Sequence, residues 1–256
     1  MLGGYREELG GFTYHLYGDY SGIEYLVLGL PDVGLVGAIT GLHLIRELKM
    51  KDVVGIDSYT SMPPVVVIHN SEPMYPMRIY RQGNLGVLLT DVPVAPPAIP
   101  GLATSLVRFA KMTGVKMLIS VTGMGTPKRI EAEKPGMYAL AVGREAEIDA
   151  GRIGASKVDN GILVGPYALI LKEAARTGVN NLVLMVESFV DLPDPEAAAV
   201  AVEAVSKITG VQVDTKKLVE EAEKLKLRLK ELMRETKNVM AKMGKSYEYR
   251  PPLIYT

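Results

Sequence analysis

Short, almost wholly apolar runs alternate along this chain with segments in which apolar residues recur at helical spacing. The apolar runs have the length of buried strands, and they occupy residues 25–28, 52–56, 65–68, 84–90, 115–121, 137–142 and 181–186, with a further strand expected at 79–80. The helical spacing predicts helices at about residues 33–48, 102–112, 162–176 and 195–208. Such alternation predicts an α/β fold in which helices cover both faces of a mainly parallel sheet.

Two parts of the chain depart from this regular alternation. Strands crowd together between residues 53 and 90, which predicts that the sheet is mixed rather than purely parallel. The first twenty-two residues combine glycine, tyrosine and acidic residues, and at most an edge hairpin is expected there. A loop is expected between residues 151 and 159.

The helix predicted at 33–48 carries an unusual set of glycines. Gly34, Gly37 and Gly41 lie on nearly one face of it, and each glycine costs about 1 kcal/mol relative to alanine in a helix. A close approach of this face to the sheet or to another subunit would offset that cost. Asp32, just before the helix, is the expected N-cap residue.

The helix predicted at 195–208 has clear start and stop signals. Asp194 is suited to the N-cap, Pro195 to the first helical position, and Glu196 to the positive pole of the helix. Gly210 is the expected end of the helix.

A different pattern begins at residue 215. Apolar positions then alternate spacings of four and three, while lysine, glutamate and arginine fill the remainder; the seam consists of Leu218, Ala222, Leu225, Leu229, Leu232, Thr236, Val239 and Met243. This predicts one long helix that ends near Gly244. Two interpretations are open: the helix lies on its own domain, or Leu218, Leu225, Leu229 and Leu232 pack against a helix of another subunit.

A short, stiff peptide follows the charged helix. Pro251 and Pro252 hold the backbone near polyproline geometry, and the chain then ends in Ile254-Tyr255-Thr256. Either this segment is a docking peptide or it is an ordinary frayed terminus. The predicted organisation is therefore an α/β domain at 1–214, a charged helix at 215–244 and an extended tail at 245–256.

Composition narrows the class of protein. The 256 residues are 48% hydrophobic and 23% charged, as in ordinary globular proteins. Lys+Arg and Asp+Glu both number 29, so no overall field attracts nucleic acid or an anionic membrane. The chain has no cysteine, no apolar signal region near its start, and no run of about 18 apolar residues. A cytoplasmic protein is expected.

No motif in the sequence predicts a catalytic, metal or cofactor site. Residues 121–128 follow a strand, but they match no phosphate-binding motif, and a structural turn is expected. His15, His43 and His69 are far apart and lack metal-ligand spacing.

If the protein were an enzyme, the carboxylates near strand ends would be its best candidates. Asp32, Glu187 and Asp191 follow predicted strands, where α/β enzymes bind ligands. Helix capping and loop solubility explain these three residues equally well.

An ordered set of short motifs resembles the archaeal proteasome assembly chaperone family, homologues of the eukaryotic proteasome assembly chaperones. The motifs run from residue 23 to 218 and comprise residues 31–37 (PDVGLVG), 62–64 (MPP), 76–80 (PMRIY), 161–165 (GILVG), 194–198 (DPEAA) and 213–214 (VD). Met62 stands where the family pattern has an aromatic residue. The resemblance implies a three-layer α/β/α fold similar to phosphorylase/hydrolase-like proteins, homo-oligomers such as tetramers or pentamers, and no catalytic site.

The resemblance also gives the last three residues a meaning. Ile254-Tyr255-Thr256 matches the hydrophobic–Tyr–any-residue (HbYX) terminus that proteasome activators insert into the α-ring of the core particle. Physically, the terminal carboxylate can pair with a lysine, Tyr255 offers a ring and a hydroxyl, and Ile254 can fill an apolar slot. The expected function is thus an ATP-independent assembly factor or activator.

Two other functions stay open at this stage. One is a small-molecule hydrolase or phosphorylase that works at the strand ends near Asp32 and Glu187. The other is an oligomeric scaffold that binds a paralogous chaperone through the helix of residues 218–243.

Overall fold

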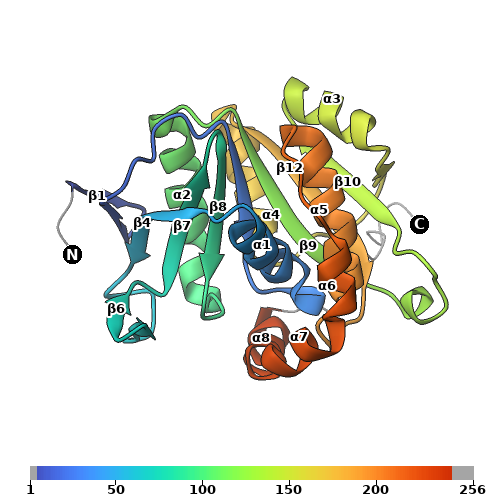
Figure 1. Cartoon of the computed structure of the whole chain (residues 1–256). Coiled ribbons are helices and arrows are strands. Elements are labelled where there is room, and N and C mark those ends of the chain that lie inside the picture. The colour runs from blue at the N-terminus through green and yellow to red at the C-terminus, as the bar shows by residue number, and fades with distance from the viewer. Residues whose placement is uncertain (1–4, 244–256) are drawn as a thin grey trace.

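A ten-stranded sheet, in the order β1-β2-β4-β7-β8-β3-β9-β12-β10-β11, forms the centre of the computed structural model, which describes residues 5–243 (Figure 1). Its strands are β1 (Tyr5–Leu9), β2 (Phe12–Leu16), β3 (Tyr25–Gly29), β4 (Lys51–Asp57), β7 (Met77–Gln82), β8 (Leu85–Thr90), β9 (Met117–Gly125), β10 (Met137–Val142), β11 (Ser156–Lys157) and β12 (Asn180–Ser188). Strands β5 (Val67–His69) and β6 (Glu72–Met74) form a separate two-stranded sheet.

The sheet is mixed, as the sequence predicts. Strands β8, β3, β9 and β12 are parallel at its centre, where both faces are buried and the strand sequences are therefore almost wholly apolar. The chain from β1 to β8 adds antiparallel neighbours on one side, joined partly by tight hairpins. The edge hairpin expected within the first twenty-two residues is the β1–β2 pair.

Helices cover both faces of the sheet and complete the predicted three-layer fold. They are α1 (Val36–Glu47), α2 (Ile99–Thr113), α3 (Arg144–Ile153), α4 (Pro166–Thr177) and α5 (Pro195–Thr209), with 3-10 turns η1 (Val33–Leu35), η2 (Pro96–Ala98) and η3 (Pro127–Ile130). The core on one face contains residues of α1, α3 and α5, and the core on the other contains residues of α2 and α4. Figure 1 shows α1 and α5 in front of the sheet.

The glycine face of α1 meets the sheet. A Cβ atom added to Gly37 would lie 2.3 Å from the carbonyl oxygen of Val121 in β9, and one added to Gly41 would lie 3.2 Å from Val87 in β8. Gly34 lies before α1 and has a positive φ of 60°. The glycines therefore permit close helix–sheet packing, one of the two explanations that the sequence left open.

Several predicted boundaries were wrong. The helix predicted from residue 33 begins at Val36, because Gly34 and Leu35 both have positive φ and interrupt it. The carboxylate of Asp32 does not cap this helix. Helix α3 was not predicted: its apolar positions are few, although Ala146 and Ile153 are buried against the core.

The predicted long helix of residues 215–244 is instead three consecutive helices: α6 (Lys216–Glu220), α7 (Ala222–Arg228) and α8 (Lys230–Met243). The apolar side of this segment nevertheless packs against the core, as the spacing of its apolar residues indicates. Leu218 and Leu225 are buried in the core beside α1 and α5, and Leu229 and Leu232 are half-buried against it. Residues 216–243 thus lie on their own domain. Pairing of these leucines with another subunit stays a prediction.

No helix within residues 5–243 combines the length and hydrophobicity needed to cross a membrane.

Candidate functional site

The carboxyl ends of the parallel strands meet at one edge of the sheet, which we call the carboxyl edge. Strand β3 leads there into η1 and α1 on one face, whereas β8 leads into η2 and α2 on the other face. Neighbouring parallel strands whose connections leave toward opposite faces create a crevice, and α/β proteins commonly bind ligands in it. The β3–β8 crevice is therefore the first place to look for a small-molecule site.

Helix α8 covers this crevice. It contacts both η1 and η2, which follow the two strands, and Figure 1 shows it below the carboxyl edge. Met233, Thr236 and Met240 of α8 are buried. An ion pair of 3.0 Å between Lys237 and Asp191 also ties α8 to the loop after β12. The chain's own helix therefore covers the place where α/β enzymes commonly bind a substrate.

The three candidate carboxylates engage different partners at this edge. Asp32 is 1% exposed, and its Oδ2 accepts a hydrogen bond of 2.8 Å from the Thr122 hydroxyl. Glu187 accepts a bond of 2.9 Å from the backbone N–H of Gly136, and Asp191 pairs with α8. Each carboxylate thus binds a neighbouring side chain or backbone segment, although Asp32 does so without capping a helix.

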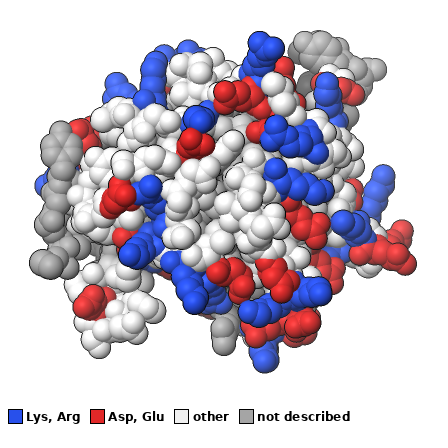
Figure 2. Space-filling view, turned by 45° about the horizontal axis from the view of Figure 1, so that its top comes forward, with Lys and Arg blue, Asp and Glu red and all other residues white. Residues whose placement is uncertain are grey.

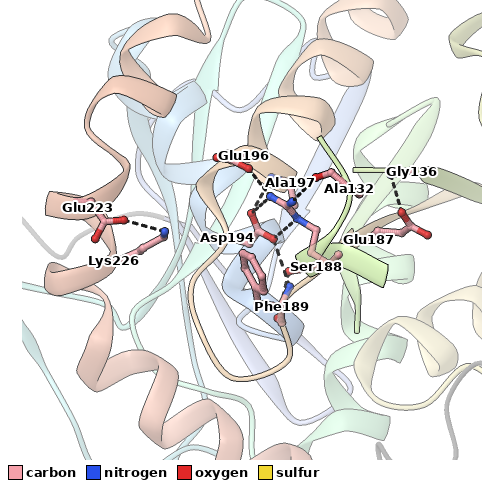
Figure 3. A network of polar contacts seen from close by, with 11 residues as sticks. Ala132, Gly136, Glu187, Ser188, Phe189, Asp194, Glu196, Ala197, Glu223 and Lys226 are labelled. Carbon is pink, nitrogen blue, oxygen red and sulfur yellow. Dashed lines mark hydrogen bonds and ion pairs between the residues drawn. The ribbon is translucent and has the colours of Figure 1, made fainter. Parts of the chain in front are cut away.

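A buried arginine, Arg129, is the centre of a polar network at the carboxyl edge that sequence reasoning missed; Figure 3 shows its partners. Arg129 of η3 donates two hydrogen bonds to Asp194, from Nε at 2.8 Å and from Nη2 at 3.1 Å. It also binds Glu196 and the carbonyl oxygen of Ala132. The network joins the segment after β9 to the start of α5.

The same network also includes the N-cap of helix α5. Asp194 accepts a hydrogen bond of 3.1 Å from the N–H of Ala197, which confirms the predicted N-cap. The guanidinium of Arg129 lies 4.8 Å from the ring centroid of Phe189. Burial by itself would lower the pKa of Arg129, but the hydrogen bonds and charges of Asp194 and Glu196 outweigh it and raise that pKa.

A buried tyrosine closes the β3–η1 turn from the other face of the sheet. The hydroxyl of Tyr167 in α4 donates to the carbonyl oxygen of Leu28 and accepts from the N–H of Leu30, both at 2.9 Å. Burial, and then the charge of Asp32, raises the pKa of Tyr167 well above its ordinary value. The Tyr167 hydroxyl therefore stays uncharged and holds the turn before α1 through its two backbone hydrogen bonds.

Replacing Tyr167 with phenylalanine is expected to lower the free energy of unfolding by about 1–3 kcal/mol, because the buried N–H of Leu30 loses its acceptor. Chemical denaturation of the two proteins measures this difference. An unchanged midpoint would show that the turn satisfies this N–H in another way.

The histidines have structural contacts as well. His43 Nε2 lies 2.7 Å from the carbonyl oxygen of Asp214 and fastens α1 to the segment before α6. His15 stacks on Tyr75, with ring centroids 4.4 Å apart. Among the described residues, no group of three or more His, Cys, Asp or Glu side chains could hold a metal ion.

The predicted docking residues Ile254, Tyr255 and Thr256 lie outside the described residues. The description of the chain ends at Met243, the last residue of α8. Since α8 lies at the carboxyl edge, the last described residues are on the same side of the molecule as the Arg129 network.

Fold and site together define a three-layer α/β protein whose ligand crevice is covered by its own C-terminal helix. The chain belongs to the PAC2 family, whose model matches residues 26–233.

Archaeal proteins are among those to which the chain is similar. PbaA of Pyrococcus furiosus, described as an archaeal homolog of proteasome-assembly chaperone, is 28% identical and has a TM-score of 0.81, with 89% of this chain and 98% of PbaA covered. PbaB of the same organism, an archaeal proteasome activator, shares the fold at 24% identity and a TM-score of 0.72, over 88% of this chain and 99% of PbaB. An uncharacterised protein of Methanocaldococcus jannaschii is 27% identical over 222 residues, which are 87% of this chain and 90% of the relative.

Proposed function

We propose that this protein is a cytoplasmic, homo-oligomeric assembly factor or activator of the proteasome that works without ATP. In this proposal, its C-terminal residues Ile254, Tyr255 and Thr256 dock on the α-ring of the core particle. The observation that carries the proposal is the similarity to PbaA over nearly the whole chain. The match of the tail to the hydrophobic–Tyr–any-residue pattern adds the mode of binding.

The covered crevice supports a protein-binding rather than an enzymatic role. A small-molecule enzyme of this fold would need access to the carboxyl ends of β3 and β8, and α8 contacts both segments that follow these strands. The candidate carboxylates Asp32 and Glu187 hold backbone segments and neighbouring side chains in place.

The chemistry of the tail suits a weak peptide that is used in several copies. A terminal carboxylate forms a charge-assisted bond with a lysine, and Pro251 and Pro252 lower the ordering cost on docking. One tail binds weakly, but several tails on one oligomer gain about 10²–10⁴ in overall affinity.

Deleting residues 254–256 is expected to abolish binding to the core particle, because all three proposed anchor groups are removed. Binding is measured with immobilised core particle, and gate opening by the hydrolysis of a fluorogenic peptide. Tyr255→Ala should give the same loss, whereas the matched control Thr256→Ala should retain binding because the last side chain is unrestricted.

A second control separates the carboxylate from the side chains. One glycine added after Thr256 keeps Ile254 and Tyr255 but moves the carboxylate, so binding should fall strongly. Light scattering should give every variant the mass of the parent oligomer. Full binding by the truncated chain would refute the proposed tail contact.

A further inference from the structure

A projecting hairpin carries the most exposed group of apolar side chains in the described chain. Residues 58–76, which we call the arm, leave the sheet after β4, form the β5–β6 hairpin and return to β7. Figure 1 shows the arm extending from the lower left of the molecule. Tyr59 is 88% exposed, and Val65, Val66 and Ile68 are also exposed.

The base of the arm is firmly attached to the body. The ring of Tyr75 packs on Gly55, where an added Cβ would lie 1.9 Å from it, and stacks on His15. The hydroxyl of Ser58 donates a hydrogen bond of 2.7 Å to the carbonyl oxygen of Gly11. These contacts fix the place at which the arm leaves the body.

The tip itself lacks neighbours that would stabilise it. Asn70 and Ser71 form its two-residue turn with positive φ at both positions, as hairpin turns of this length require. An isolated two-stranded hairpin is only marginally stable in water. A surface that covers Val66 and Ile68 would therefore stabilise the arm.

The arm is also nearly free of charge. Glu72 is its single Asp, Glu, Lys or Arg residue, and the lobe at the lower left of Figure 2 is mostly white while charges cover much of the remaining surface. An uncharged apolar tip suits an apolar protein surface rather than a polyanion.

The same chain carries a second exposed apolar surface, which we call the rim. It consists of Ile130, which is 79% exposed, together with Val190 and Leu192, both exposed. Charged residues flank these side chains: Glu131 follows Ile130, and Asp191, between Val190 and Leu192, is paired with Lys237. Ile130 follows Arg129 directly, and Val190 and Leu192 lie between Phe189 and Asp194. The buried Arg129–Asp194 pair therefore holds the two segments that display the rim.

Arm and rim lie at different positions along the carboxyl edge. The arm joins β7 at Met77, which pairs with Thr90 at the end of β8. The rim follows the ends of β9 and β12, where Gly125 pairs with Ser188. Strand β3 lies between β8 and β9 in the sheet, so the two surfaces are on opposite sides of the crevice that α8 covers.

We propose that the arm of one copy docks on the rim of a neighbouring copy. The chain supplies both surfaces, each displays exposed apolar side chains from segments held in place at their base, and their separation keeps them available to two different neighbours. The inference rests on the proposed homo-oligomer and names its interface.

The unlike character of arm and rim determines the symmetry of the assembly. A contact between two different surfaces is heterologous, and it closes into a ring when the rotation between copies allows. In a closed ring every copy presents its carboxyl edge to the same side. All tails that follow α8 would then start from one side of the ring, as simultaneous docking on one α-ring requires.

Charged substitutions on each surface test the contact. The arm variant is Val66→Asp/Ile68→Asp, the rim variant is Val190→Asp/Leu192→Asp, and the matched control is Ile148→Asp, an equally exposed apolar residue on α3. Light scattering of the full-length chains should give monomers for the arm and rim variants and the parental mass for the control. Circular dichroism checks that each variant is folded.

Mixing the two variants gives the decisive result. The arm variant keeps an intact rim and the rim variant keeps an intact arm, so an equimolar mixture should form a dimer with one restored contact and nothing larger. A monomeric mixture, or variants that retain the parental mass, would overturn the proposal, as would a monomeric parent protein. Tail-deleted protein keeps arm and rim, so it should retain the parental mass while it loses docking. Docking that survives the deletion would refute the tail contact and leave the arm–rim contact untouched.

Discussion

Arg129→Met is expected to destabilise the protein by about 3–5 kcal/mol, the usual cost of removing one partner from a buried ion pair. The guanidinium and the carboxylate of Asp194 are both almost fully buried and share two hydrogen bonds. Without the arginine, the charge of Asp194 stays buried and uncompensated. Urea denaturation monitored by circular dichroism measures the loss.

A double variant provides the control for this prediction. Asp194→Asn removes the carboxylate charge but keeps a good N-cap for α5, so Arg129→Met/Asp194→Asn should recover a substantial part of the lost stability. A single variant that unfolds within about 1 kcal/mol of the parent would show that the pair behaves as a surface ion pair.

Gly37→Ala is the second substitution with a large expected effect, about 3 kcal/mol or more of destabilisation. The new methyl group would lie 2.3 Å from the carbonyl oxygen of Val121 and 3.0 Å from the Tyr167 hydroxyl. Backbone of a central strand cannot yield as a flexible side chain does, so α1 would have to move away from the sheet.

Gly151→Ala is the matched control. Gly151 lies in α3, and an added Cβ there meets nothing within 4 Å. Alanine is better than glycine in an open helical position by about 1 kcal/mol, so this variant should be slightly more stable than the parent. If both variants behaved alike in thermal unfolding, the close approach of α1 to β9 would not limit stability.

Local sequence signals predicted those parts of the fold that depend on the residues of a single segment. Most of the apolar runs identified strands of the ten-stranded sheet, because strands buried on both faces must be apolar throughout. The run at residues 65–68 was wrongly predicted as a buried strand, since it lies in the exposed arm and outside this sheet. Asp194, Pro195 and Gly210 located helix α5, since capping chemistry depends on a few neighbouring residues. The glycines of α1 predicted a close approach, and the structure identified the sheet as the partner.

Sequence reasoning failed where two distant segments had to meet. Arg129 and Asp194 are 65 residues apart, and nothing near either residue predicts the other. Likewise, the heptad pattern predicted an apolar seam correctly, but not that its helix would be divided near Glu221 and Leu229 to follow the surface of the domain.

By itself, therefore, the sequence determined the α/β class, the buried central strands, the boundaries of helix α5 and the resemblance to proteasome assembly chaperones. Each of these depends on periodicity, capping or short motifs. Only the tertiary structure decided that α8 covers the β3–β8 crevice, that Arg129 holds the two segments of the rim, and that the arm stands apart from the body. Burial, ion pairing and exposure depend on residues far apart in the chain, and these meet only once the sheet has formed.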